Sequence, residues 1–222
     1  TRQEASIYQC LLTEGKVTGY EVAKQTGISR SNAYNSLASM TEKGAAYLVE
    51  EASTRKYVPV PLNEFCKNRI RKLEESGKWL QEHMPMEKAY VEGYITIEGA
   101  ENILNKIKNL LSQVDQRVYI SCTRNYLLLL IRELDTLMEE RKKVVIITDQ
   151  PATFHNAKVY FGENRGMQIG IIADSKYVLT GEYGEGSMNT CLYSGQKNFV
   201  ELYKTALANE IKLLSIREEN KD

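Results

Sequence analysis

A run of polar side chains stands between Gly27 and Leu37 of this 222-residue chain, and it comprises Ser29, Arg30, Ser31, Asn32, Tyr34 and Asn35. Arginine can form a paired hydrogen bond with guanine, asparagine can do so with adenine, and serine hydroxyls bind phosphate oxygens. Two later basic residues, Arg55 and Lys56, could contact the phosphates of the same duplex. Any one of these residues is weak support, since Arg30 could be a solvated helix residue and Tyr34 a core residue. Together they favour contact with double-stranded DNA, provided that a helix carries residues 29–35.

The residues around this run predict a winged helix-turn-helix. Thr18 and Glu21 form a capping box that starts a short helix, and Gly27 ends it. Ser29 is a good N-cap for the following helix. The other elements expected here are a helix over residues 4–12 and two strands over 46–50 and 56–60, joined by a polar turn at 51–54. In such a fold the second helix of the pair enters the major groove, and the strand pair, or wing, lies over the phosphates.

A longer helix is predicted from Leu62 to about Met84, where Pro85 ends the pattern. Its apolar and small residues recur at the a and d positions of a heptad repeat: Cys66, Ile70, Leu73, Gly77, Leu80 and Met84. Two interpretations stay open. The helix packs on its own domain, or it pairs as a coiled coil with the same helix of a second subunit. Residues 1–90 carry 13 Lys/Arg and 11 Asp/Glu, so a monomer would bind DNA weakly at physiological salt and a homodimer is expected.

The second half of the chain alternates strands with helices, which indicates βαβ units. The expected strands cover residues 94–97, 118–121, 144–148, 167–173, 176–179 and 187–193. The expected helices cover 100–111, 127–138 and 196–214. The predicted organisation is therefore a two-domain chain of the α+β and α/β classes. It has a winged helix-turn-helix over residues 1–61, a linker and dimerisation helix over 62–85, and an α/β effector or dimerisation domain over 86–222.

Polar residues follow two of the expected parallel strands. Ligands of open α/β sheets bind beyond the carboxyl ends of the strands, where Arg124 and Asp149 are expected. These two residues are candidates for holding a polar or anionic small-molecule effector. The alternative is that both are ordinary loop residues.

Composition excludes several classes of protein. The 29 basic residues equal the 29 acidic ones, which argues against a strongly basic nucleic-acid coat. The longest apolar runs, residues 127–131 and 144–147, are far too short to span a membrane. Four scattered cysteines indicate a reducing cytoplasm, and two histidines cannot build a multi-histidine metal site. We therefore expect a cytoplasmic protein without a membrane partner, a metal or a cofactor.

The order of motifs in the first 65 residues resembles the DNA-binding domain of TrmB-type transcriptional regulators. The matching segments are Glu4-Ala5 with Tyr8, Glu21-Val22-Ala23, Ser29-Arg30-Ser31 with Tyr34 and Leu37, and Glu42-Lys43-Gly44. The resemblance implies a coiled-coil linker and a C-terminal effector domain. Members commonly sense sugars, often through a further C-terminal module, and we expect this module to be absent because the sequence ends soon after the last expected helix.

The second half resembles the phospholipase D fold in the segments YITIEGAENILNKI, RVYIS and IGIIADSKYVLTGEY. Phospholipase D enzymes use H-x-K-x4-D and a later G-S-x-N, with the histidine as nucleophile. His155, Lys158 and Asp174 do not have this spacing, although residues 186–189 read G-S-M-N. Met167-Gln168-Ile169 stands where the histidine and lysine would be. We therefore expect no catalytic residues, and the alternatives are a phosphodiesterase with a nucleic-acid-binding appendage or a winged helix that binds only proteins.

Overall fold

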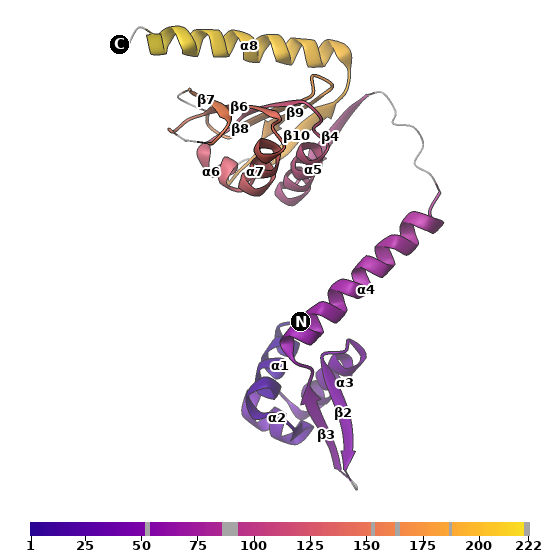
Figure 1. Ribbon diagram of the computed structural model, residues 1–222. Coiled ribbons are helices and arrows are strands. Elements are labelled where there is room, and N and C mark those ends of the chain that lie inside the picture. Colours follow the sequence, from indigo (N-terminus) through magenta and orange to yellow (C-terminus); the bar gives the residue numbers. More distant parts are fainter. Residues whose placement is uncertain (52–53, 86–92, 152–153, 163–164, 187, 220–222) are drawn as a thin grey trace. The chain divides into compact units, whose positions relative to one another are not determined.

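The computed structural model describes residues 1–51, 54–85, 93–151, 154–162, 165–186 and 188–219 (Figure 1). The chain divides into two units, Thr1–Glu87 and Lys88–Asp222, and each has its own hydrophobic core. Each unit is therefore described by itself.

The first unit contains a winged helix-turn-helix, as the sequence predicts. Its elements are α1 (Arg2–Glu14), β1 (Val17–Thr18), α2 (Gly19–Thr26), α3 (Arg30–Glu42), β2 (Ala46–Glu51) and β3 (Thr54–Pro59). The three strands form an antiparallel sheet in the order β1-β3-β2. The sequence does not predict β1, because a strand of two residues shows no alternation of apolar and polar side chains. The turn expected at 51–54 includes residues 52–53, which lie outside the described residues.

Local signals start and stop these helices as expected. The Thr18 side chain and the Glu21 side chain form both halves of a capping box at the start of α2. Gly27 ends α2 with a left-handed φ of 70°, a conformation that glycine adopts without a steric penalty. The Ser29 hydroxyl caps α3 by accepting a hydrogen bond from the Asn32 N–H at 3.4 Å.

The helix predicted after the wing is α4 (Leu62–His83), and none of its residues is buried. Its first turn touches the unit through Phe65, whose ring lies 5.8 Å from that of Tyr8. The heptad side chains beyond that point face solvent: Ile70 is 56% exposed and Leu73 is 69% exposed. The interpretation that this helix packs its apolar seam on its own domain is therefore wrong.

The second unit is a seven-stranded mixed sheet covered by helices on both faces (Figure 1). Its strands are β4 (Tyr94–Glu98), β5 (Arg117–Ser121), β6 (Lys143–Thr148), β7 (Ala157–Phe161), β8 (Gln168–Ala173), β9 (Tyr177–Glu182) and β10 (Thr190–Ser194). The strand order is β4-β10-β9-β8-β5-β6-β7, in which only β5, β6 and β7 pair in parallel. On one face lie α5 (Ala100–Ser112), α6 (Arg124–Leu128) and α7 (Ile131–Glu139), and on the other lies α8 (Lys197–Glu219).

Two features of this unit differ from the sequence prediction. The single helix expected over 127–138 is two helices, α6 and α7, with a break at Leu129 and Leu130. Leu127 and Leu130 are both buried, as they would also be on one face of an unbroken helix, so the spacing of the leucines does not reveal the break. The strand β7 was missed, although its residues Ala-Lys-Val-Tyr-Phe have the β-branched and aromatic character of a strand.

Asp174 fastens the tight turn between β8 and β9 to the start of β5. The turn places Asp174 and Ser175 at φ values of 49° and 54°. The Asp174 carboxylate accepts hydrogen bonds from the backbone N–H groups of Asp115 at 2.8 Å, Gln116 at 2.8 Å and Arg117 at 2.9 Å. Burial acts to raise the pKa of Asp174, but the three N–H donors outweigh it, so the pKa lies below its ordinary value.

The substitution Asp174→Asn tests how much these hydrogen bonds to the carboxylate stabilise the fold, because asparagine tolerates the left-handed turn but cannot carry the charge. We expect a loss of about 1–2 kcal/mol in the free energy of urea unfolding at pH 7. A lowered carboxyl pKa stabilises the fold above the unfolded value of about 3.9 and stops doing so as the pH falls through the folded value. The difference between the two proteins should therefore shrink below about pH 4. The exposed control Asp135→Asn should show neither effect, and an equal loss in both variants would contradict the assignment.

Candidate nucleic-acid interface

One face of α3 is buried, and the opposite face carries the predicted site residues. Ala33 and Leu37 are completely buried and Met40 is 2% exposed, which anchors the helix against α1 and α2. Each member of the polar set is exposed: Ser29, Arg30, Ser31, Asn32, Tyr34 and Asn35. The structure thus brings together, on the first turns of one helix, all the residues that the sequence analysis selected there.

Two residues of α2 that the sequence analysis missed shape this surface. The guanidinium carbon of Arg30 lies 4.5 Å from the ring centroid of Tyr20, a cation–π contact that holds the arginine at the exposed end of α3. The ring of Tyr34 lies so close to Gly19 that an added Cβ would come within 2.4 Å of it. Gly19 therefore permits the close approach of α2 and α3. A search for an aromatic residue one helix before Arg30 could have found Tyr20.

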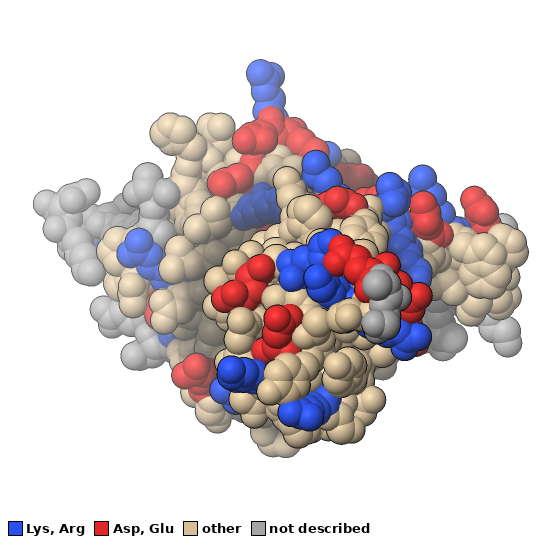
Figure 2. Space-filling model, turned by 90° about the horizontal axis from the view of Figure 1, so that it is seen from below, with Lys and Arg blue, Asp and Glu red and all other residues tan. Residues whose placement is uncertain are grey.

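The basic residues of the wing are paired with acidic ones. The Nε atom of Arg55 lies 3.0 Å from Glu50, and the Nζ atom of Lys56 lies 2.9 Å from Glu51. Lys16 also forms an ion pair with Glu51. Arg55 and Glu50 are direct partners in the β2–β3 register, so a register assigned from the turn could have predicted that pair. Figure 2 shows the same mixture of signs, with blue and red side chains side by side on the face that it views.

Glu51 is the acidic centre of this group. Hydrogen bonds from Lys16 and then Lys56 lower the pKa of Glu51 to about 2. Glu51 is therefore ionised at neutral pH and offsets part of the positive charge that the wing would offer to phosphate groups.

The two candidate effector-binding residues of the second unit, Arg124 and Asp149, are joined by a hydrogen bond from the backbone of one to the side chain of the other. The Asp149 carboxylate accepts a hydrogen bond from the N–H of Arg124 at 2.8 Å, at the first residue of α6. An acidic side chain at this position satisfies a free amide of the helix start and interacts favourably with its dipole. The Arg124 side chain is exposed.

The residues of the phospholipase D comparison lie apart. His155 is exposed in a turn, Lys158 lies on β7, and Asp174 lies in the β8–β9 turn. Strands β5 and β6 separate β8 from β7 in the sheet. Asn189 binds backbone, since its side chain accepts from the Gly184 N–H at 2.9 Å and donates to the Gly184 carbonyl at 3.3 Å. Ser187 lies outside the described residues. The structure therefore does not assemble these side chains into one site.

The described residues contain neither a membrane-spanning helix nor a cluster of metal-binding side chains. Among these residues, none of the helices combines the length and the apolar character that crossing a bilayer requires. The same part of the chain holds no group of three or more His, Cys, Asp or Glu side chains that could bind a metal ion.

Comparison with known proteins supports the resemblance of the first unit. Residues 1–63 match the family model described as sugar-specific transcriptional regulator TrmB. The chain is 31% identical over 163 residues to the uncharacterized protein YrhO of Bacillus subtilis (strain 168), a match that covers 72% of this chain and 59% of YrhO. The chain thus spans less than two thirds of the length of this curated relative.

Solved structures of low sequence identity resemble the chain. TrmBL2, an archaeal chromatin protein reported to bind DNA in a novel mode, is 18% identical with a TM-score of 0.48, over 96% of this chain and 93% of that one. NucT from Helicobacter pylori is 16% identical with a TM-score of 0.44, over 54% of this chain and 97% of that one. Nuc from Salmonella typhimurium, a phospholipase D family member, is 10% identical with a TM-score of 0.42, over 53% and 92%.

The substitution Glu51→Gln tests how far the wing is neutralised. It removes the carboxylate that pairs Lys16 and Lys56, so both lysines become available to phosphates. We expect tighter binding to duplex DNA and a slope of log affinity against log salt that is steeper by about 1 to 2. Fluorescence anisotropy with a labelled duplex at several salt concentrations measures both. The exposed control Glu82→Gln on α4 should change neither, and an unchanged slope in Glu51→Gln would show that the wing does not reach the DNA.

Proposed function

We propose that this chain is a sequence-specific DNA-binding transcriptional regulator that acts as a homodimer on an inverted-repeat operator. The observation that carries the proposal is the exposed polar face of α3, which a buried stripe on the same helix holds outward in a winged domain of TrmB type. Arg30, Asn32 and Asn35 have the side chains that read guanine and adenine in the major groove. Ser29, Ser31, Tyr34, Arg55 and Lys56 are proposed to contact phosphates and to set the register of the helix.

The homodimer is proposed from the exposed seam of α4. A seam with Leu73 at 69% exposure and Leu80 at 48% exposure places contiguous apolar surface in water unless a second helix covers it. The same helix in a second subunit has the same spacing and supplies that cover. A dimer also doubles the phosphate contacts, which compensates for a winged domain whose basic residues are largely paired.

We propose a regulatory, non-catalytic role for the second unit. The carboxylate of Asp174 is engaged by three backbone N–H groups, and Lys158 lies on a strand removed from it. A phosphodiesterase would need its nucleophile and its acid within reach of one phosphate. A small-molecule effector is proposed to bind the second unit and to modulate DNA binding. The family description names sugars for the regulators that it covers, whereas the match here is confined to residues 1–63.

Genomic-fragment selection followed by sequencing tests the DNA-binding proposal, with Arg30→Ala as the decisive variant. Loss of one paired guanine contact should weaken operator binding by about 1–3 kcal/mol and relax specificity at one base pair of each half-site. The control Arg69→Ala removes an exposed arginine from α4 and should keep both affinity and specificity. Operator affinity within twofold of the wild type in Arg30→Ala would show that the assigned residues do not read the bases. No enrichment of any fragment would favour a winged helix that binds only proteins.

Sedimentation equilibrium of Leu73→Glu tests the dimer. A charge at a d position of the seam would be buried against the partner helix, so we expect a monomer at micromolar concentration and a loss of cooperative operator binding. The neighbouring change Lys72→Glu alters the charge of the helix by more than Leu73→Glu does but lies off the seam, and it should stay dimeric. If Leu73→Glu remained a dimer, another surface would have to form the interface.

A further inference from the structure

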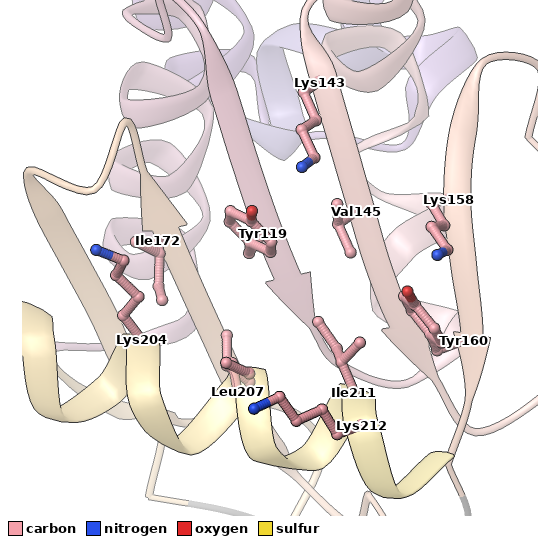
Figure 3. A pocket seen from close by; sticks show the side chains of 11 residues that line it. Tyr119, Lys143, Val145, Lys158, Tyr160, Ile172, Lys204, Leu207, Ile211 and Lys212 are labelled. Carbon is pink, nitrogen blue, oxygen red and sulfur yellow. The ribbon is translucent and has the colours of Figure 1, made fainter. Parts of the chain in front are cut away.

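A pocket of about 350 Å³ lies between α8 and the sheet of the second unit (Figure 3). Its floor is a row of residues in register across adjacent strands: Ile172 of β8 is opposite Tyr119 of β5, which is opposite Val145 of β6. Ile172 is 1% exposed and Val145 is 3% exposed. The floor is therefore apolar and rigid, because the backbone pairing of the sheet fixes each of its members.

Three residues of α8 form the opposite wall. Leu207, Ala208 and Ile211 are spaced so that they share one face of the helix, and they line the pocket. Ala208 contributes a small side chain to this wall, which leaves space that a larger residue would fill. The volume lies in the lower part of the range for small-molecule sites.

Four lysines surround the apolar centre. Figure 3 shows Lys143, Lys158, Lys204 and Lys212 on different sides of it, from β6, β7 and α8. The Nζ of Lys143 lies 5.9 Å from the ring centroid of Tyr119, and that of Lys158 lies 5.0 Å from the ring centroid of Tyr160. No aspartate or glutamate is among the described residues that line the pocket. Lys204 has an acidic neighbour outside it, Glu201, at 3.2 Å.

We propose that this pocket binds an amphipathic organic anion, with an apolar body on the floor and an acidic group among the lysines. The apolar floor contributes to binding only when the ligand buries apolar surface against it. The lysines contribute binding free energy when the ligand carries a carboxylate, sulfonate or phosphate group, because hydrogen bonds between these charged groups are charge-assisted. A neutral apolar molecule has the apolar surface but no acidic group, and inorganic phosphate has the acidic group but no apolar surface. That such a ligand would regulate DNA binding rests on the function proposed above.

A second cavity beneath α8 is less suited to an anion. Its volume is about 470 Å³, and its cationic residue is Arg165. The Arg165 guanidinium already forms an ion pair with Glu210 and a hydrogen bond with Ser121. An incoming anion would have to displace that carboxylate, whereas no acidic residue is among the described residues that line the lysine pocket.

The test uses a pair of fluorescent probes that share one aromatic body. 8-Anilinonaphthalene-1-sulfonate carries the acidic group, and N-phenyl-1-naphthylamine lacks it. Titration of the full chain without DNA should show one site per chain for the sulfonate, with an affinity about tenfold above that of the neutral probe. Because DNA is absent, the result does not depend on whether the chain binds an operator. Equal affinity for the two probes would overturn the proposal.

Variants place the probe in this pocket. Lys143→Gln combined with Lys212→Gln should weaken sulfonate binding about tenfold and leave the neutral probe within about twofold. Ala208→Phe should weaken both probes because it fills the cavity, and thermal unfolding of each variant checks that the fold is intact. The matched control Lys197→Gln, on the same helix but outside the lining, should change neither. Unchanged sulfonate binding in the double lysine variant would overturn the proposal.

Two further arms distinguish the sources of the anionic group. Vesicles of phosphatidylglycerol that compete with the sulfonate, and that lose this competition in the double variant, would identify a lipid as the ligand. Failure of vesicles to compete would identify a free amphipathic molecule. If the double variant kept full sulfonate binding but lost affinity for duplex DNA, the lysines would belong to a DNA-binding surface, and the pocket would not be a ligand site.

Discussion

Burial of one stripe of α3 decides what the first unit can do. Ala33, Leu37 and Met40 pack against α1 and α2, and the 3.6-residue period of the helix then turns Arg30, Asn32 and Asn35 to the outside. The caps at Thr18 and Ser29 and the left-handed Gly27 set the angle at which α3 leaves the turn. Every proposed base contact depends on this packing, and the contact of Arg30 with the Tyr20 ring adds to it for one of the three side chains.

Charge is distributed differently in the two units. On the wing, Arg55 and Lys56 stand beside Glu50 and Glu51, and Lys16, which precedes β1, also pairs with Glu51, so the charge of these basic residues is largely compensated at short range. Around the α8 pocket the lysines stand over an apolar floor with no acidic residue in the described lining. A chain with zero net charge can therefore hold one surface whose basic residues are balanced and another where they gather. The overall composition averages over the two surfaces and therefore reveals neither the paired charges of the wing nor the lysines around the pocket.

The exposed seam of α4 connects these features to an assembly. The 22 residues of this helix include no buried side chain, and it contacts its own unit through Phe65, which lies beside Tyr8, and through Glu64, which accepts a hydrogen bond from the Tyr47 hydroxyl. It therefore gains little stability from that unit. The proposed partner helix would cover its apolar repeat and would also bring two winged domains to one duplex. The second unit contributes a sheet whose two faces are used separately: one packs α5 to α7, and the other packs α8 and leaves the pocket.

The sequence by itself determined the local elements and the polar set of α3. Capping residues, glycines and a period of 3.6 residues are local signals, so they predicted the winged helix-turn-helix and the long helix from Leu62. They could not reveal β1, which is recognised by its pairing with β3, or the close approach of Gly19 to Tyr34, because both depend on contacts between separate elements. Only the tertiary structure decided that Glu51 pairs the wing lysines and that Asp149 caps α6. It alone brought Tyr119, Val145 and Ile172 into one row beneath α8, since strand register is a property of pairing between segments and not of any one of them.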